Sequence, residues 1–126
     1  MAKRAKALGM KVLVDFHYSD FWVDPGQQKK PDAWKNDSGD KLVDDVYAYT
    51  AKVMQDFNAQ GVTPDMVQVG NELNNGMLWP EAQLTEDNPN GYKFLAKLLN
   101  AGLQAVHDND KDNNDEQYKM HMCAQR

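Results

Sequence analysis

Short β-rich runs alternate with longer amphipathic stretches along this chain, and this alternation restricts the possible folds more than any other feature. Residues 11–17 (KVLVDFH) and 66–71 (MVQVGN) have the composition of buried strands. Apolar residues recur at helical spacing over residues 41–60 and again from about 88 to 107. Strands that alternate with helices are typical of parallel sheets with crossover helices. The sequence therefore predicts an α/β fold.

Boundary signals locate the helix starts and suggest that the pattern is part of a larger fold. We expect Asp40 to cap the first long helix and Asn88–Pro89 to begin the second. Residues 1–9 have the pattern of the end of an earlier helix, and residues 118–123 resemble the beginning of a third strand. The acidic connector over 107–117 lacks the glycine and the terminal glutamate of a calcium loop, so we expect a solvated loop there.

The composition excludes several classes of function. The 126 residues carry a formal net charge of −5, whereas nucleic-acid binding needs clustered Lys and Arg. No run approaches the roughly 18 apolar residues of a membrane helix. The single cysteine, Cys123, excludes an internal disulfide framework and a Cys-based zinc site. We therefore expect a single acidic domain with no nucleic-acid partner, no membrane span, no metal and no cofactor, and residues 1–9 do not have the pattern of a signal peptide.

The alternation of side chains along each strand predicts one polar and one apolar face. On the second strand, Gln68 and Gly70 share a face with Glu72, which leaves Val67 and Val69 for the helices. On the first strand the same rule separates the polar Asp15 and His17 from the apolar Val12, Val14 and Phe16. We expect the polar faces to line a cavity, with Asp15 in a structural role that orients its neighbours.

Both strand ends carry residues suited to work on carbohydrate. Active sites of alternating α/β folds gather at the carboxyl ends of the strands. Glu72 follows the second strand directly after Asn71, and glycoside hydrolysis uses a carboxylic acid to protonate the leaving oxygen. The neighbouring amide can hold a sugar hydroxyl. Trp22 and Trp79 follow the two strands and offer flat faces for packing on sugar rings.

Two long motifs, DFHYSDFWVDP and VQVGNELNNGMLWP, resemble glycoside hydrolase family 53, the endo-β-1,4-galactanases. The resemblance covers nearly the whole chain. It implies a (β/α)₈ TIM barrel, of which residues 1–126 match about strand three to the start of strand five of one partial catalytic domain. It further implies retaining endo-hydrolysis of β-1,4-galactosidic bonds in galactan or type I arabinogalactan, a polysaccharide as the only partner, a monomer when complete, and secretion or a cell-surface location.

The resemblance also implies roles for single residues. Glu72 would be the general acid/base at the end of strand four, and Asn71 would hold the sugar. The loop after strand three would line the cleft with His17, Asp20, Trp22 and Asp24. A retaining mechanism needs a second glutamate as nucleophile, at the end of strand seven, and that strand is not among these 126 residues.

Simpler interpretations stay open for each of these residues. Glu72 on its own could be a surface glutamate and Asn71 a turn residue. His17 could be a hydrogen-bonded structural histidine, the tryptophans could pack in the core, and Asp20 and Asp24 could form turns near Pro25. For the whole chain, the alternatives are another barrel glycosidase such as a mannanase or cellulase, a non-catalytic carbohydrate-binding or vestigial half-barrel, and a chain that associates through exposed edge strands.

Overall fold

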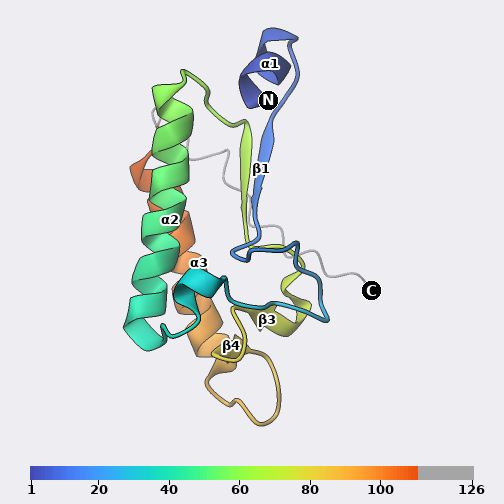
Figure 1. Cartoon of the computed structure of the whole chain (residues 1–126), viewed down its shortest axis with the longest axis vertical. Helices are drawn as coiled ribbons and strands as arrows, with labels where there is room; N and C mark the ends of the chain where they lie inside the picture. Colours follow the sequence, from blue (N-terminus) through green and yellow to red (C-terminus); the bar gives the residue numbers. More distant parts are fainter. Residues whose placement is uncertain (111–126) are drawn as a thin grey trace.

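The computed structural model describes residues 1–110 and confirms the predicted alternation (Figure 1). Along the chain, the main elements are helix α1 (Ala2–Ala7), strand β1 (Leu13–Phe16), helix α2 (Gly39–Ala59), strand β2 (Met66–Val69) and helix α3 (Gly91–Asp108). Strands β1 and β2 are parallel, in register from Leu13 opposite Met66 to Phe16 opposite Val69. The third strand expected at 118–123 lies outside the described residues.

Both long helices lie on the same side of this two-stranded sheet and pack against each other (Figure 1). Their apolar stripes and the facing side chains of the strands form the core, which includes Phe16, Leu42, Val46, Met54, Val67, Val69, Leu98 and Val106. Helix α3 approaches β2 closely at Gly102, where a Cβ would lie 2.5 Å from Cγ1 of Val69. No helix within residues 1–110 is both long and apolar enough to cross a bilayer.

The connections that follow β1 and β2 lie together at the end of the molecule opposite α1 (Figure 1). The first contains a 3₁₀ helix at Asp32–Trp34. The second contains a 3₁₀ helix at Leu73–Asn75 and a hairpin of strands β3 (Gly76–Met77) and β4 (Ala82–Gln83). The sequence predicted plain loops here, because two-residue strands leave no alternation of polar and apolar residues to detect.

Both expected helix starts are wrong. Helix α2 begins at Gly39, with Ser38 before it, and α3 begins at Gly91, with Asn90 before it. The Asn88 side chain is used elsewhere: its amide donates to the carbonyls of Glu81 and Gln83 at 3.1 and 2.9 Å. It therefore holds the hairpin in place of capping the helix. The strands are also shorter than predicted: the first run loses residues at both ends to connections, whereas the second begins at Met66 as predicted and loses only Gly70 and Asn71.

Asp65 joins α1 to the beginning of the sheet. Its carboxylate accepts hydrogen bonds from Lys6 Nζ at 2.7 Å, from the Val12 backbone N–H at 2.8 Å and from Lys11 Nζ at 3.3 Å. The Lys6 ammonium, followed by the Val12 amide, holds the pKa of Asp65 well below its ordinary value.

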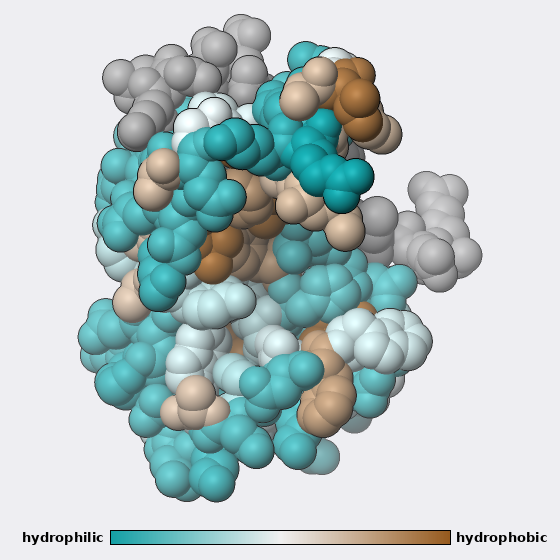
Figure 2. Space-filling view, turned by 45° about the horizontal axis from the view of Figure 1, so that its top comes forward, coloured by the Kyte–Doolittle hydropathy of each residue, from teal (hydrophilic) through white to brown (hydrophobic). Residues whose placement is uncertain are grey.

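The surface view shows apolar side chains at the floor of a hollow near the centre of one face, bordered by hydrophilic side chains (Figure 2). Large apolar residues are also exposed on single elements, among them Leu13 on β1 at 54% and Tyr49 on α2 at 48%.

Candidate active site

The two faces of the sheet carry the residues that the alternation predicted. Phe16, Val67 and Val69 face the helices and are only 3–4% exposed. Asp15 and Gln68 are register partners on the opposite face. There Gln68 Nε2 donates to Asp15 Oδ1 at 3.1 Å. The face away from the helices is therefore polar and internally hydrogen-bonded at the carboxyl end of the sheet.

His17 continues this polar network beyond the end of β1. Its Nε2 lies 3.3 Å from Asp15 Oδ2, and its Nδ1 accepts a hydrogen bond of 3.0 Å from the backbone N–H of Val23. Because Nδ1 is an acceptor, the ring proton is on Nε2 and points to Asp15. Burial raises the pKa of the Asp15 carboxyl, an effect that His17 and Gln68 oppose. With both ring nitrogens engaged, His17 anchors the loop and is not placed to act as a base.

Glu72 lies two residues beyond Gly70, at the point where the chain leaves β2 for the 3₁₀ helix. Its backbone is in the left-handed region, with φ 50° and ψ 54°. A residue other than glycine adopts this conformation at a cost of about 1–3 kcal/mol, and such residues cluster at functional sites. The side chain is half-buried, and no donor among residues 1–110 reaches its carboxylate. The carboxylate is therefore available to a substrate.

Asn71, which directly precedes Glu72, bonds both to the loop after β1 and to strand β2. Its Nδ2 donates to the carbonyl of Val23 at 3.0 Å, and its Oδ1 accepts from Gln68 Nε2 at 3.3 Å. The amide thus fixes the loop after β1 against the end of β2. One of its two N–H groups is left for a further acceptor.

Gln28 lies between the two loops and is only 2% exposed. Its Nε2 donates to the carbonyls of Asn71 at 2.9 Å and Glu72 at 3.2 Å, and it also lies 3.3 Å from the carbonyl of Asp24. Two further hydrogen bonds join the same loops at other points. The backbone N–H of Trp79 donates to the Gln28 carbonyl at 2.8 Å, and Asn75 Nδ2 donates to the Pro25 carbonyl at 2.7 Å.

The predicted aromatic residues differ in how firmly they are held. Trp22 is 72% exposed and lines a small hollow of about 50 Å³ with Phe21, Val23 and Lys29. Trp79 is half-buried, and its indole N–H donates to the Asn75 carbonyl at 2.9 Å. Trp22 therefore offers an open face, whereas Trp79 is part of the second loop's own framework.

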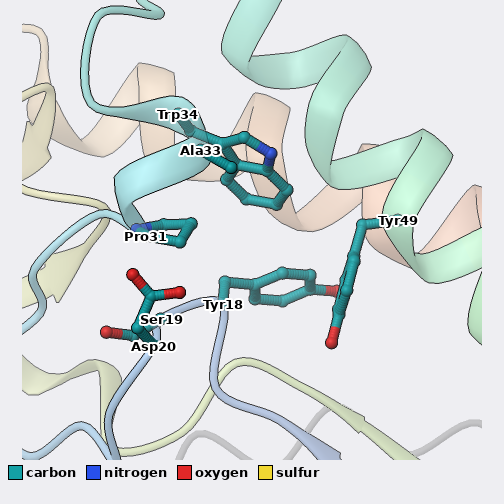
Figure 3. Close-up of a pocket in the computed structure, with 7 residues that line it drawn as sticks. All are labelled: Tyr18, Ser19, Asp20, Pro31, Ala33, Trp34 and Tyr49. Carbon is teal, nitrogen blue, oxygen red and sulfur yellow. The ribbon is translucent and has the colours of Figure 1, made fainter.

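Of the two predicted aspartates of the first loop, Asp24 stabilises a turn and Asp20 holds the start of the 3₁₀ helix. Asp24 Oδ1 accepts from the Gly26 N–H at 2.6 Å, and Asp20 Oδ2 accepts from the Asp32 N–H at 2.7 Å. Asp24 lies beside the Gln28 network. Asp20 instead lines a separate pocket of about 180 Å³ whose other walls include three aromatic rings (Figure 3). The structure thus brings His17, Asp24, Asn71 and Glu72 into one connected region and places Asp20 beside it.

The aromatic pocket contains rings from three elements. Tyr18, Trp34 and Tyr49 lie with ring centroids 5.9–6.4 Å apart (Figure 3). Tyr18 is the innermost ring, and burial raises the pKa of its phenol. In the part of the chain that the structure describes, no three His, Cys, Asp or Glu side chains gather as metal ligands.

Comparison with known proteins identifies the family. The model of one family, described as Glycosyl hydrolase family 53, matches residues 1–124. The chain belongs to this family. The family 53 catalytic domain of Ignisphaera aggregans superposes with a TM-score of 0.77 at 43% identity, over 94% of this chain and 30% of that one. A fungal β-1,4-galactanase superposes with a TM-score of 0.75 at 39% identity. This family 53 chain is therefore a segment of a (β/α)₈ barrel, as the sequence predicted.

Named relatives extend the comparison. A protein of Aspergillus terreus named "Probable arabinogalactan endo-beta-1,4-galactanase A" is 44% identical over 108 residues. One of Cellvibrio japonicus named "Arabinogalactan endo-beta-1,4-galactanase" is 44% identical over 110 residues. Each match covers 86% of this family 53 chain and 30% or 29% of the relative. The chain thus spans about 30% of the length of these relatives.

The sequence did not single out Gln28, Trp34 or Tyr49. Gln28 lies in a polar run next to Gln27, and no spacing or periodicity separates the buried glutamine from the exposed one. Trp34 and Tyr49 meet only because the first loop folds back on α2. No sequence signal joins them, because Trp34 lies in the first loop and Tyr49 in the middle of α2.

Proposed function

We propose that this segment supplies the acid/base half of the active site of a retaining endo-β-1,4-galactanase, with Glu72 as general acid/base. The observation that carries the proposal is the position of Glu72. It follows β2 in a left-handed conformation beside Asn71, and its half-buried carboxylate accepts no hydrogen bond from residues 1–110. The names of the Aspergillus terreus and Cellvibrio japonicus relatives support galactan as the substrate of the complete protein.

In this mechanism, Glu72 acts twice. Its protonated carboxyl gives a proton to the glycosidic oxygen as the bond to the anomeric carbon breaks, and a second carboxylate from elsewhere in the barrel attacks that carbon. Glu72, now ionised, takes a proton from the water that hydrolyses the glycosyl-enzyme. The product keeps its anomeric configuration. The proton returned to Glu72 restores it for the next cycle.

The neighbouring residues bind and orient the sugar. We assign the second N–H of Asn71 to the sugar 2-hydroxyl, a hydrogen bond that strengthens in the transition state. Trp22 and Trp79 pack against sugar rings, with Trp22 the more accessible of the two. We assign His17 and Asp24 to the cleft wall and Asp20 to its outer edge, beside the aromatic pocket; each side chain also holds the shape of the first loop through a hydrogen bond.

The test is Glu72→Gln in the complete enzyme. Glutamine keeps the shape but cannot give or take the proton, so we expect turnover of galactan to fall by about 100-fold or more with little change in binding. Glu86→Gln, the same change at an exposed glutamate of the second loop, is the control and should leave turnover intact. Unchanged galactan turnover in Glu72→Gln would overturn the assignment.

A substrate panel separates this function from its rivals. Release of reducing ends from galactan, but not from mannan or cellulose, is expected of a galactanase. Preference for mannan or cellulose would indicate another barrel glycosidase. Galactan binding without any release would indicate a non-catalytic carbohydrate-binding protein.

Properties of the complete protein follow from the same proposal. We assign residues 1–126 to one part of a single catalytic domain. A polymeric substrate cannot enter a cell intact, so the enzyme acts outside it, either secreted or at the cell surface. The complete barrel acts as a monomer on polysaccharide alone.

A further inference from the structure

Gln28 is a buried amide whose donors point to the backbone on both sides of Glu72. Its Nε2 lies 2.9 Å from the Asn71 carbonyl and 3.2 Å from the Glu72 carbonyl, the oxygens that precede and follow the Glu72 Cα. We propose that Gln28 is a positioning residue, which fixes the direction of the Glu72 carboxyl by holding these two peptide groups. This inference rests on the proposed role of Glu72.

The backbone of Glu72 needs such support. Its left-handed conformation is unfavourable for a residue with a side chain, so it persists only where the surroundings impose it. Rotation of either peptide group would change φ or ψ of Glu72 and move its carboxyl. The Gln28 amide restrains both peptide groups at once, and its burial excludes water that could replace it.

Other bonds between the two loops do not share this property. Asn75 Nδ2 and the Trp79 N–H also cross between the loops, but they bond to Pro25 and Gln28 and leave the Glu72 peptides untouched. Loss of the Asn75 bond would loosen the contact between the loops. Loss of the Gln28 amide would in addition release the Glu72 backbone, so the two effects can be separated.

A misdirected acid has a distinct kinetic signature. A galactan bond has a poor leaving group and needs the proton from Glu72, whereas a dinitrophenolate leaves without one. Hydrolysis of the glycosyl-enzyme still needs Glu72 as a base, but azide is already an anion. It attacks the anomeric carbon of the glycosyl-enzyme, the bond from that carbon to the nucleophilic carboxylate breaks, and the products are the glycosyl azide and the free carboxylate. An enzyme with a misplaced Glu72 should therefore fail on galactan and recover on a dinitrophenyl galactobioside with azide.

The test is Gln28→Met in the complete enzyme, because methionine fills the same space without a donor. We expect kcat on galactan to fall about 10- to 100-fold with KM within about 3-fold, and the rate on the dinitrophenyl substrate with azide to stay within about 3-fold of wild type. Gln60→Met, the same change at an exposed glutamine at the end of α2, should be neutral. Asn75→Ala should lower the stability of the protein, and any loss of turnover should be the same on galactan and on the dinitrophenyl substrate.

Gln28→Glu keeps the shape of the side chain and provides a second test if the methionine variant does not fold. Its ionised carboxylate repels the three carbonyls, whereas its protonated form can still donate one hydrogen bond, so its deficit on galactan should shrink as the pH falls. Equal losses on both substrates in the Gln28 variants would overturn the positioning role while leaving Glu72 in place. Unchanged turnover in Glu72→Gln would instead remove the proposed function itself.

Discussion

A single hydroxyl joins the end of β1 to helix α2 inside the core. Tyr18 is 4% exposed, and its phenolic oxygen lies 2.7 Å from Thr50 Oγ1. Thr50 in turn donates to the Val46 carbonyl at 2.7 Å, so the hydrogen between Tyr18 and Thr50 belongs to the tyrosine. Burial raises the pKa of this phenol, which keeps it protonated and able to donate.

Removal of the acceptor and removal of the donor of this hydrogen bond should lower the free energy of unfolding by different amounts. Thr50→Val leaves the Tyr18 hydroxyl in the core without its acceptor, so we expect a loss of about 1–3 kcal/mol in the free energy of unfolding. Tyr18→Phe removes the donor and leaves Thr50 bonded to Val46, so about 0.5–1.5 kcal/mol is expected. Urea unfolding of the complete protein measures both. A larger loss for Tyr18→Phe would contradict this arrangement.

Between elements, Asp65 is the electrostatic link that attaches α1 to the sheet. It bonds to α1 through Lys6 and to the approach of β1 through the Val12 amide, while lying itself just before β2. Helix α1 buries none of its residues within the part of the chain described, so this carboxylate is its principal attachment. The attachment depends on the charge of Asp65 and therefore on pH.

Asp65→Asn should lower the thermal midpoint most at neutral pH. The pKa of Asp65 is depressed in the folded state, so its contribution is fully present above the unfolded value, about 3.9, and is lost as the pH falls toward the folded value. The difference between wild type and Asp65→Asn should therefore shrink between pH 5 and pH 2. Thermal unfolding across this range measures it, and a difference that grows on acidification would refute the link.

A matched control is Asp56→Asn on α2. Its carboxylate is 59% exposed and pairs only with Lys52, at 2.7 Å, among the contacts within residues 1–110. Exposed pairs of this kind contribute little to stability. The midpoint should change less in this variant than in Asp65→Asn at neutral pH.

For the whole molecule, a parallel two-stranded sheet with helices on one side leaves a face to be covered. Parallel sheets occur almost only where both faces are buried. Here Leu13 is 54% exposed on the face opposite the helices. In a complete barrel, further strands and their side chains would pack against this face.

The 126-residue chain studied on its own should therefore self-associate. We expect its apparent mass in size exclusion with light scattering to rise with concentration, because apolar surface and unpaired strand edges favour association. The complete enzyme is the control and should elute as a monomer. A 126-residue chain that stays monomeric at 100-fold dilution and at high concentration alike would contradict this expectation.

Much of the architecture was predictable because it follows from periodicity. The order of strands and helices, the burial of Val67 and Val69, and the position of Glu72 after β2 all follow from alternation and from the strand-end motifs. The hairpin and the helix starts were not, since the Asn88 side chain bonds to carbonyls of the hairpin segment and does not cap the helix it precedes. Gln28 could not be separated from Gln27, because only the folded loops decide which of two adjacent glutamines is enclosed.

The hydrogen bonds between the loop after β1 and the loop after β2 have a consequence for protein engineering. Gln28 and Val23 on one loop form hydrogen bonds with Asn71 and Glu72 on the other, so neither loop can be exchanged without the other. A chimaera with a junction inside α2 would unite loops from two parents whose contacts had never been selected together. Residues 17–30 and 71–79 should therefore be inherited as one block when family members are recombined.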